Sequence, residues 1–193
     1  MNPYETTFII LYFLFFILAS VIRVVYSRRF EQPRSTPDRT DRSLSALPIF
    51  GMLILPLIYG LTSWLDFANY TLPAWTGCIG AALFGLADWL LWRSHADLGR
   101  QWSINVELQH EHRLVTTGVY HRIRHPMYSA HLVWGLAQPL LLWNWLAGFS
   151  MLAFSLPLYL YRVGREEKMM ETKFGEEYEE YRKRTGMFIP KVF

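Results

Sequence analysis

Long uncharged runs dominate the pattern of hydrophobic and polar positions along the chain. Asp, Glu, Lys and Arg are absent from residues 6–22, 43–65, 67–87 and 126–161. Each of the first three runs is close to the ~20 residues that a helix needs to cross about 30 Å of hydrocarbon. The fourth run is too long for one crossing, and its Trp143–Asn144–Trp145 segment suits a tight turn at a membrane interface. The pattern therefore predicts an all-α, polytopic integral membrane protein with five transmembrane helices.

The same pattern divides the chain into two regions. We expect residues 1–104 to form three transmembrane helices with their linkers. Residues 105–193 are expected to contain a polar segment, a transmembrane hairpin over 126–163 and a C-terminal helix. That last helix is predicted to be amphipathic, because aromatic residues recur at helical spacing among its many charges. These aromatic residues are Phe174, Tyr178 and Tyr181.

The two hairpin helices are predicted to be shorter than ordinary crossings. Together with their turn they share the 36 uncharged residues of 126–161. A short helix pair would leave a gap at the cytosolic end of the bundle, which other parts of the protein must fill. We expect the polar residues that flank the hairpin, at 121–125 and 162–167, to meet in this gap.

Composition and charge agree with a lipid environment. The chain is 52% hydrophobic and only 18% charged, against about 25% charged residues in a soluble domain. The first uncharged run is too long for a signal peptide and is followed by Arg28 and Arg29, so it is expected to remain as an anchor. Basic residues gather on one side of a five-helix path, which predicts an external N-terminus and a cytosolic C-terminus. Anionic phospholipid headgroups account for this charge, and no nucleic acid is required.

Histidines gather before the hairpin, but their pattern does not favour a metal site. Five of the six histidines lie between residues 110 and 131. His121 and His125 have the i, i+4 spacing of helical metal ligands, yet Pro126 restricts His125 away from helical backbone geometry. The single cysteine, Cys78, excludes an intramolecular disulfide and a cysteine-rich metal site. We therefore expect no metal.

Charged side chains at the two ends of the hairpin are candidates for ligand binding. Arg124 and His125 offer donors for a carboxylate, although contact with lipid phosphates is the simpler alternative. Placing the charged side chains of Glu166 and Glu167 at the end of a membrane helix costs free energy unless a cation or an ammonium group is near them. A structural ion pair between Glu166 and Arg162, at i, i+4 spacing, is the alternative interpretation of that pair.

Sequence blocks from residue 105 onward resemble a known family. The blocks are HRLVTTGVY at 112–120, RHPMY at 124–128, the apolar hairpin, Arg162 with Glu166–Glu167, and FGEEY at 174–178. In this order they are similar to the isoprenylcysteine carboxyl methyltransferase family and to the related membrane phospholipid methyltransferases. One position departs from the family pattern, because Ala130 stands where the family usually has glycine.

The resemblance implies an enzyme that uses S-adenosyl-L-methionine and releases S-adenosyl-L-homocysteine. It implies catalytic roles for Glu167 and for Arg162, the latter on the acceptor side. The absence of a G-x-G-x-x-G motif agrees with a cofactor site that is not of the Rossmann type. The residues implied in cofactor binding are His112, Arg113, Leu114, Val115, Tyr120, His125, Pro126, Met127, Tyr128 and Glu166.

The resemblance also implies a lipophilic acceptor, and two acceptor chemistries stay open. The favoured acceptor is the carboxylate of a prenylcysteine-like lipidated molecule, which Arg162 would hold. The alternative is the amine of an ethanolamine phospholipid, for which a histidine or glutamate would have to act as a base. A transporter or a non-catalytic membrane protein is disfavoured, because transporters usually contain internal repeats and this chain has none.

Overall fold

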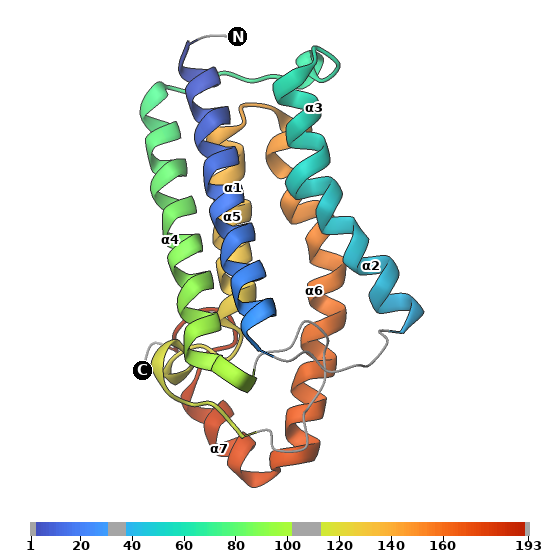
Figure 1. Ribbon diagram of the computed structural model, residues 1–193, viewed down its shortest axis with the longest axis vertical. Helices are drawn as coiled ribbons and strands as arrows, with labels where there is room; N and C mark the ends of the chain where they lie inside the picture. Colours follow the sequence, from blue (N-terminus) through green and yellow to red (C-terminus); the bar gives the residue numbers. More distant parts are fainter. Residues whose placement is uncertain (1–2, 31–37, 102–112, 192–193) are drawn as a thin grey trace.

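The computed structural model is an elongated bundle of helices, and it describes residues 3–30, 38–101 and 113–191 (Figure 1). Within these ranges the chain forms no strand, only two isolated bridges. Short 3-10 turns connect some of the helices. The main helical elements are α1 (Pro3–Arg29), α2 (Arg39–Ile49), the π-helical turn η1 (Phe50–Ile54), α3 (Leu55–Leu61), α4 (Ala74–Leu98), α5 (Pro126–Leu141), α6 (Trp145–Phe174) and α7 (Glu176–Arg184).

Four helical rods in the described part of the chain are long and apolar enough to cross a membrane. They comprise residues Tyr4–Arg29, Arg39–Leu61, Ala74–Gln101 and Trp145–Phe174. The second rod is continuous through α2, η1 and α3. The expected all-helical membrane protein is thus confirmed. The fifth crossing stays a prediction, because α5 has only 16 residues and rises about 24 Å at 1.5 Å per residue.

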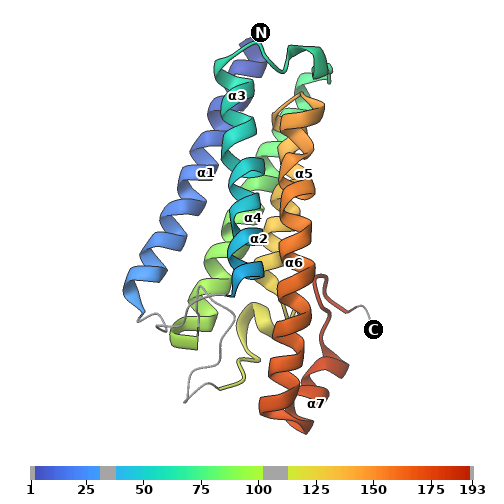
Figure 2. The ribbon, with the colours of Figure 1, turned by 90° about the vertical axis from the view of Figure 1, so that its right-hand side faces the viewer.

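Helices α4 and α5 pack closely along each other. Helix α1 packs on α4 and α5, whereas the rod of α2 and η1 packs on α6 (Figure 2). Aromatic rings fill the interior: the ring centroids of Phe84 and Trp134 are 4.6 Å apart, and those of Tyr12 and Phe84 are 5.5 Å apart. In the bundle core, therefore, large side chains of three helices interlock.

A buried amide links the rods to one another. The Gln138 side chain of α5 donates hydrogen bonds to the carbonyl oxygens of Gly51 and Ala147, and accepts one from the Tyr12 hydroxyl. The π-helical turn around Gly51 lies so close to α6 that a Cβ there would be 2.4 Å from the carbonyl oxygen of Ser150. The hydrogen bonds of Gln138 matter inside a bundle in lipid, because no water is present there to satisfy backbone groups.

The turn expected at residues 143–145 joins α5 to α6. Its Asn144 is fully buried and caps α6, because its side-chain oxygen accepts bonds from the backbone N–H groups of Leu146 and Ala147. The Asn144 amide nitrogen donates to the carbonyl of Leu65 and to the side chain of Asn69. The turn is therefore also held to the loop between α3 and α4.

Two expectations about the C-terminal part were wrong. Helix α6 has 30 residues and continues to Phe174, so only one hairpin helix is short; the charged residues after Tyr161 are good helix formers and extend the helix beyond the apolar segment. The expected single amphipathic helix is interrupted at Gly175, whose φ of +50° favours glycine. Tyr178 and Tyr181 of α7 are buried, so this aromatic stripe packs inward.

Candidate functional site

The candidate site lies at the polar end of the bundle, which consists of residues 113–125 and 162–191. His125 immediately precedes α5 and has a non-helical backbone, because Pro126 follows it and opens the helix. The C-terminal tail pairs with this segment: the backbone N–H groups of Arg124 and His125 donate to the carbonyls of Gly186 and Met187. The tail thereby fixes the direction of the Arg124 and His125 side chains.

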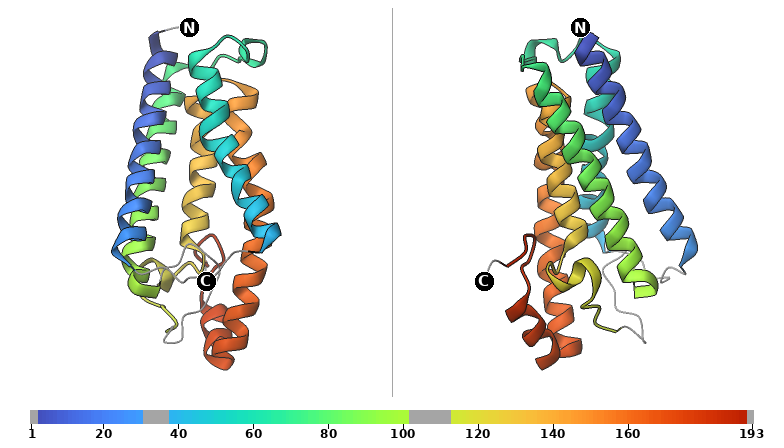
Figure 3. Two further views of the ribbon diagram at one scale, coloured as in Figure 1. Left: turned by 45° about the vertical axis from the view of Figure 1, so that its right-hand side comes forward. Right: turned by 90° about the vertical axis from the view of Figure 1, so that its left-hand side faces the viewer.

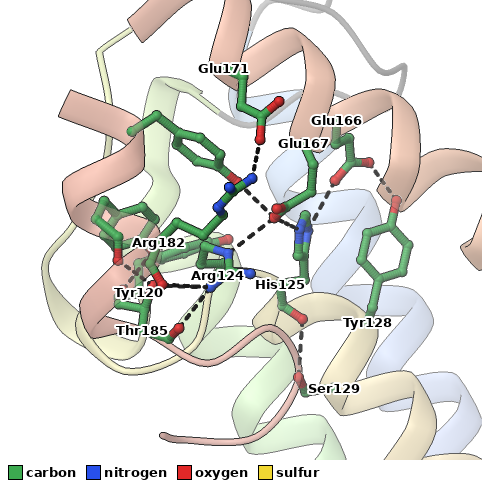
Figure 4. A network of polar contacts seen from close by, with 12 residues as sticks. Tyr120, Arg124, His125, Tyr128, Ser129, Glu166, Glu167, Glu171, Arg182 and Thr185 are labelled. Atoms are coloured by element: carbon green, nitrogen blue, oxygen red, sulfur yellow. Dashed lines mark hydrogen bonds and ion pairs between the residues drawn. The ribbon is translucent and has the colours of Figure 1, made fainter. Parts of the chain in front are cut away.

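The paired glutamates of α6 converge on His125 (Figure 4). Its Nε2 lies 2.8 Å from Oε1 of Glu167, and its Nδ1 lies 3.3 Å from Oε2 of Glu166. The hydroxyl of Tyr128, one turn into α5, donates to Oε1 of Glu166 at 2.5 Å. Four residues from the predicted set, separated by about 40 positions in the chain, therefore form one hydrogen-bonded cluster.

Glu167 carries the most donors in this cluster. Besides His125, the guanidinium of Arg124 donates to it at 3.1 Å and the hydroxyl of Tyr178 donates at 2.7 Å. All three donors reach the same oxygen, Oε1. The second oxygen, Oε2, takes no part in these bonds.

The glutamates also determine the charge of His125. Burial alone would lower the pKa of its imidazole, but hydrogen bonds to Glu166 and Glu167 outweigh burial and raise this pKa above its ordinary value. In its protonated form, His125 is a second cation beside Arg124, opposite the two glutamate side chains.

Tyr120 belongs to the same end of the molecule but not to this cluster. Its side chain is buried, which raises the pKa of its hydroxyl well above the ordinary value. The hydroxyl donates to the backbone oxygen of Ser94 at 3.3 Å, on α4. The Tyr120 backbone oxygen accepts a 2.7 Å bond from Tyr181 of α7. Tyr120 therefore connects α4 and α7 in this structure.

Arg162 has a partner that the sequence did not indicate. The alternative interpretation, an ion pair with Glu166, was wrong: Nε and Nη2 of Arg162 donate to the two oxygens of Asp41 at 2.7 and 2.8 Å. Ser45 of α2 accepts a further bond from Nη2 at 3.0 Å. Asp41 is buried. Its only sequence signal is a carboxylate in a basic segment, just before the long uncharged run of 43–65.

The remaining candidates are partly described. His112 lies outside the described residues. Arg113 is exposed and its backbone N–H donates to the side chain of Gln101, while Leu114 and Val115 are half-buried. Met127 of α5 is half-buried. Among the residues that the structure describes, no group of three metal-ligating side chains comes together.

Fold and site together define a helical integral membrane protein with a polar cluster at one end of its bundle. Residues 78–172 match the model of the isoprenylcysteine carboxyl methyltransferase (ICMT) family. The matched segment contains the His125, Glu166 and Glu167 cluster. The resemblance to this family that the sequence blocks indicated is therefore confirmed.

Curated relatives and a solved structure agree with the family match. A protein-S-isoprenylcysteine O-methyltransferase of Schizosaccharomyces pombe is 39% identical over 85 residues, 42% of this chain and 35% of the relative. The Homo sapiens protein-S-isoprenylcysteine O-methyltransferase is 29% identical over 144 residues, 70% of this chain and 51% of the relative. A solved structure of the eukaryotic intramembrane Ras methyltransferase ICMT aligns with a TM-score of 0.50 and 25% identity, over 78% of this chain and 50% of that chain. The chain spans about half the length of the curated relatives it matches.

Proposed function

We propose that this protein is an integral membrane methyltransferase that transfers a methyl group from S-adenosyl-L-methionine to the carboxylate of a prenylcysteine-like lipidated acceptor. The observation that carries the proposal is the family match over residues 78–172. Within that segment, His125, Glu166 and Glu167 converge in one cluster. The relatives named above as O-methyltransferases favour a carboxylate acceptor over the amine of an ethanolamine phospholipid.

The donor set of the cluster fits the polar part of S-adenosylmethionine. The methionine portion carries an ammonium group, for which Glu166 and the second oxygen of Glu167 are suitable partners. His125 holds both glutamates in place, and Arg124 holds Glu167. The ring of Tyr128, packed 5.1 Å from that of Tyr159, offers an aromatic surface for adenine. Contacts from His112 to Val115 and at Tyr120, Pro126 and Met127 belong to the same proposal.

The chemistry requires orientation more than acid–base catalysis. S-adenosylmethionine supplies a methyl group on a positively charged sulfur, which a carboxylate oxygen can attack directly with S-adenosylhomocysteine as the leaving group. Holding the two reactants in line lowers the barrier by about 7–11 kcal/mol when the geometry is good. Arg162 would orient the acceptor: its Nε and Nη2 are bound to Asp41 and Ser45, and its Nη1 is not engaged in these bonds.

We place the polar end on the cytosolic side of the membrane and the N-terminus outside. Basic residues concentrate at this end, and cytosolic segments of membrane proteins carry an excess of Lys and Arg. Contact with anionic phospholipids at this surface is part of the proposal. A polar cofactor would then arrive from the cytosol, while a lipid acceptor would arrive from the bilayer.

A side-by-side assay tests the acceptor class. The purified protein in lipid nanodiscs is incubated with labelled S-adenosylmethionine and either a farnesylated cysteine with a free carboxylate or phosphatidylethanolamine. We expect labelled methyl ester from the first acceptor only. Label in amine lipid alone would contradict the carboxylate proposal, and label in neither acceptor would contradict the methyltransferase proposal.

The cofactor site predicts a loss of affinity in Glu167→Gln. Removing one charged hydrogen-bond partner should weaken binding of S-adenosylhomocysteine about tenfold to hundredfold in isothermal titration calorimetry. Glu177→Gln is the matched control, because Glu177 is exposed on α7. Thermal melting separates loss of binding from loss of folding, and Glu166→Gln is a second variant. Unchanged affinity in both folded variants would exclude a cofactor role for the pair.

A further inference from the structure

Arg23 occupies the face of α1 that packs into the bundle. Along this face, Tyr12 contacts Phe84, Phe16 contacts Trp134, and Tyr26 contacts His95, with ring centroids 5.3–5.8 Å apart. Residues 12, 16, 19, 23 and 26 follow the helical period and therefore lie on one stripe. Arg23 is the charged residue of this stripe, one turn after the buried Ala19. Its side chain thus emerges on the side of α1 that faces α4 and α5.

Arg23 has polar side chains of α5 and α6 near it. Arg162, Tyr159 and Tyr128 lie within electrostatic range of its guanidinium. Arg23 also acts on His131 of α5, whose ring stacks on that of Tyr159 at 5.5 Å. Arg23 therefore faces the side of the core on which Tyr128 reaches Glu166 of the candidate site.

Arg23 lacks an anion in the described structure. Two nitrogens of the nearby Arg162 are bound by the carboxylate of Asp41. Arg23, by contrast, forms no hydrogen bond or ion pair within residues 3–30, 38–101 and 113–191. The buried Nδ1 of His131 is likewise without a hydrogen-bond partner there. Cations within membrane helices are rare and costly, and they usually pair or mark a ligand path. Asp41 thus neutralises Arg162, whereas no carboxylate among the described residues contacts Arg23.

The unmatched charge is accessible from outside the bundle. The Arg23 side chain is exposed although its neighbours on the stripe pack inward. In the views of Figure 3, α1 and α2 diverge towards the polar end of the bundle. An anionic group carried on a lipid chain could reach Arg23 between these helices.

We propose that Arg23 binds the carboxylate of the lipid acceptor, together with Nη1 of Arg162, and so selects acceptors with an anionic end. This inference rests on the proposed function and adds a specificity residue from α1, outside the segment that matches the family. The guanidinium groups of one residue on α1 and one on α6 would hold the carboxylate. The acyl or prenyl chain would extend into lipid between α1 and α2.

Kinetics with charged and neutral acceptor analogues test this role. Arg23→Gln should raise KM for the farnesylated cysteine carboxylate about tenfold to hundredfold. Its affinity for S-adenosylhomocysteine should be unchanged. The corresponding carboxamide, which cannot be methylated, should compete weakly and equally with wild type and variant. Arg23→Lys should raise KM less than Arg23→Gln does. Arg28→Gln changes an exposed residue near the end of the same helix and should leave KM at the wild-type value.

Two outcomes would overturn the inference. An unchanged KM in folded Arg23→Gln would show that the acceptor carboxylate does not meet this residue. If Arg23→Gln raises KM in nanodiscs that contain phosphatidylglycerol but not in nanodiscs without it, Arg23 binds a lipid phosphate instead. Failure of the proposed function is distinguishable, because then the wild type itself would not methylate the carboxylate acceptor.

An internal ion pair is the competing structural explanation. Asp88 of α4 is buried with both carboxylate oxygens unpartnered, and it lies on the α4 face that contacts α1 through Phe84 and His95. If Arg23 served Asp88, Asp88→Asn would reproduce the effects of Arg23→Gln. We expect Asp88→Asn to leave KM for the carboxylate acceptor within about twofold of wild type. Matching KM increases in the two variants would contradict the acceptor role.

Discussion

At the scale of the residue, His125 has the largest number of roles in the polar cluster. It ends the loop before α5, it contacts both glutamates, and its backbone N–H holds the C-terminal tail. Pro126 explains the first role, because it fixes where the helix begins. The other roles follow from the position of α6, whose two adjacent glutamates approach both nitrogens of one imidazole.

The raised pKa of His125 predicts how stability depends on pH. The folded-state pKa lies above that of the unfolded chain, about 6.5. The stabilisation is therefore complete below pH ~6.5 and is lost as pH rises through the folded-state pKa. His125→Gln should thus lower the melting temperature most at low pH, by the equivalent of about 1.5–3 kcal/mol. Melting of the purified protein in detergent between pH 5 and pH 9 measures this difference.

His121→Gln is the control for this experiment, because His121 is exposed just before the same helix. The control should show the wild-type pH profile. A destabilisation by His125→Gln that grows with rising pH would mean that the imidazole is neutral in the folded protein.

At the scale of the element, the contact between α2 and α6 depends on one buried ion pair. Asp41 and Arg162 are 121 positions apart and meet with side chains that are 5% and 13% exposed. Asp38 begins α2, and its side chain accepts a bond from the backbone N–H of Asp41. The cap thus orients the first turn of α2 so that Asp41 faces α6. The charged region beyond the apolar span of α6 is thereby anchored to the second rod.

Asp41→Asn should destabilise the protein strongly, because it leaves the guanidinium of Arg162 without its carboxylate. Breaking one side of a buried pair costs about 3–5 kcal/mol. Asp38→Asn is the matched control: its ion pair with Arg165 is 43% exposed on both sides, and Asn is an equally good helix cap. We expect a much smaller change for the control. Comparable melting temperatures for the two variants would contradict the structural role of Asp41.

At the scale of the whole molecule, polar side chains of the interior connect the rods. Gln138 lies fully buried in α5 and reaches α1, η1 and α6 through four hydrogen bonds. Tyr70 adds a further link, donating to the carbonyl of Pro139. These bonds lie towards the end of the bundle opposite the polar cluster. The fold is therefore fixed at one end by Gln138 and Asn144, and at the other by ion pairs.

Gln138→Leu should lower stability by about 1–2 kcal/mol, because the partners of the amide lose bonds that lipid cannot replace. Leu136→Ala is the control on the same helix, since Leu136 is 58% exposed on the outside of the bundle. Methyl transfer at low temperature should persist in folded Gln138→Leu. A stability equal to the wild type would show that these interior bonds do not hold the rods together.

Hydrophobic length alone determined that the chain is a helical membrane protein, where its hairpin turns and which residues flank that hairpin. These are local properties, because an uncharged run of sufficient length has few other stable arrangements in lipid. The sequence also named His125, Tyr128, Glu166 and Glu167. It also predicted that the two segments flanking the hairpin meet, but not which atoms of these side chains form hydrogen bonds.

Tertiary structure alone decided which charges meet. The partner of Arg162 is Asp41, Tyr120 turns to α4, and α6 extends far past its apolar part. Arg23 was one basic residue among several until the packing of α1 placed it on the stripe of that helix that faces α4 and α5. Ionic contacts depend on which helices become neighbours and how each is rotated. Packing across the whole bundle determines which helices are neighbours and how they are rotated, and the hydrophobic pattern of the sequence does not reveal this arrangement.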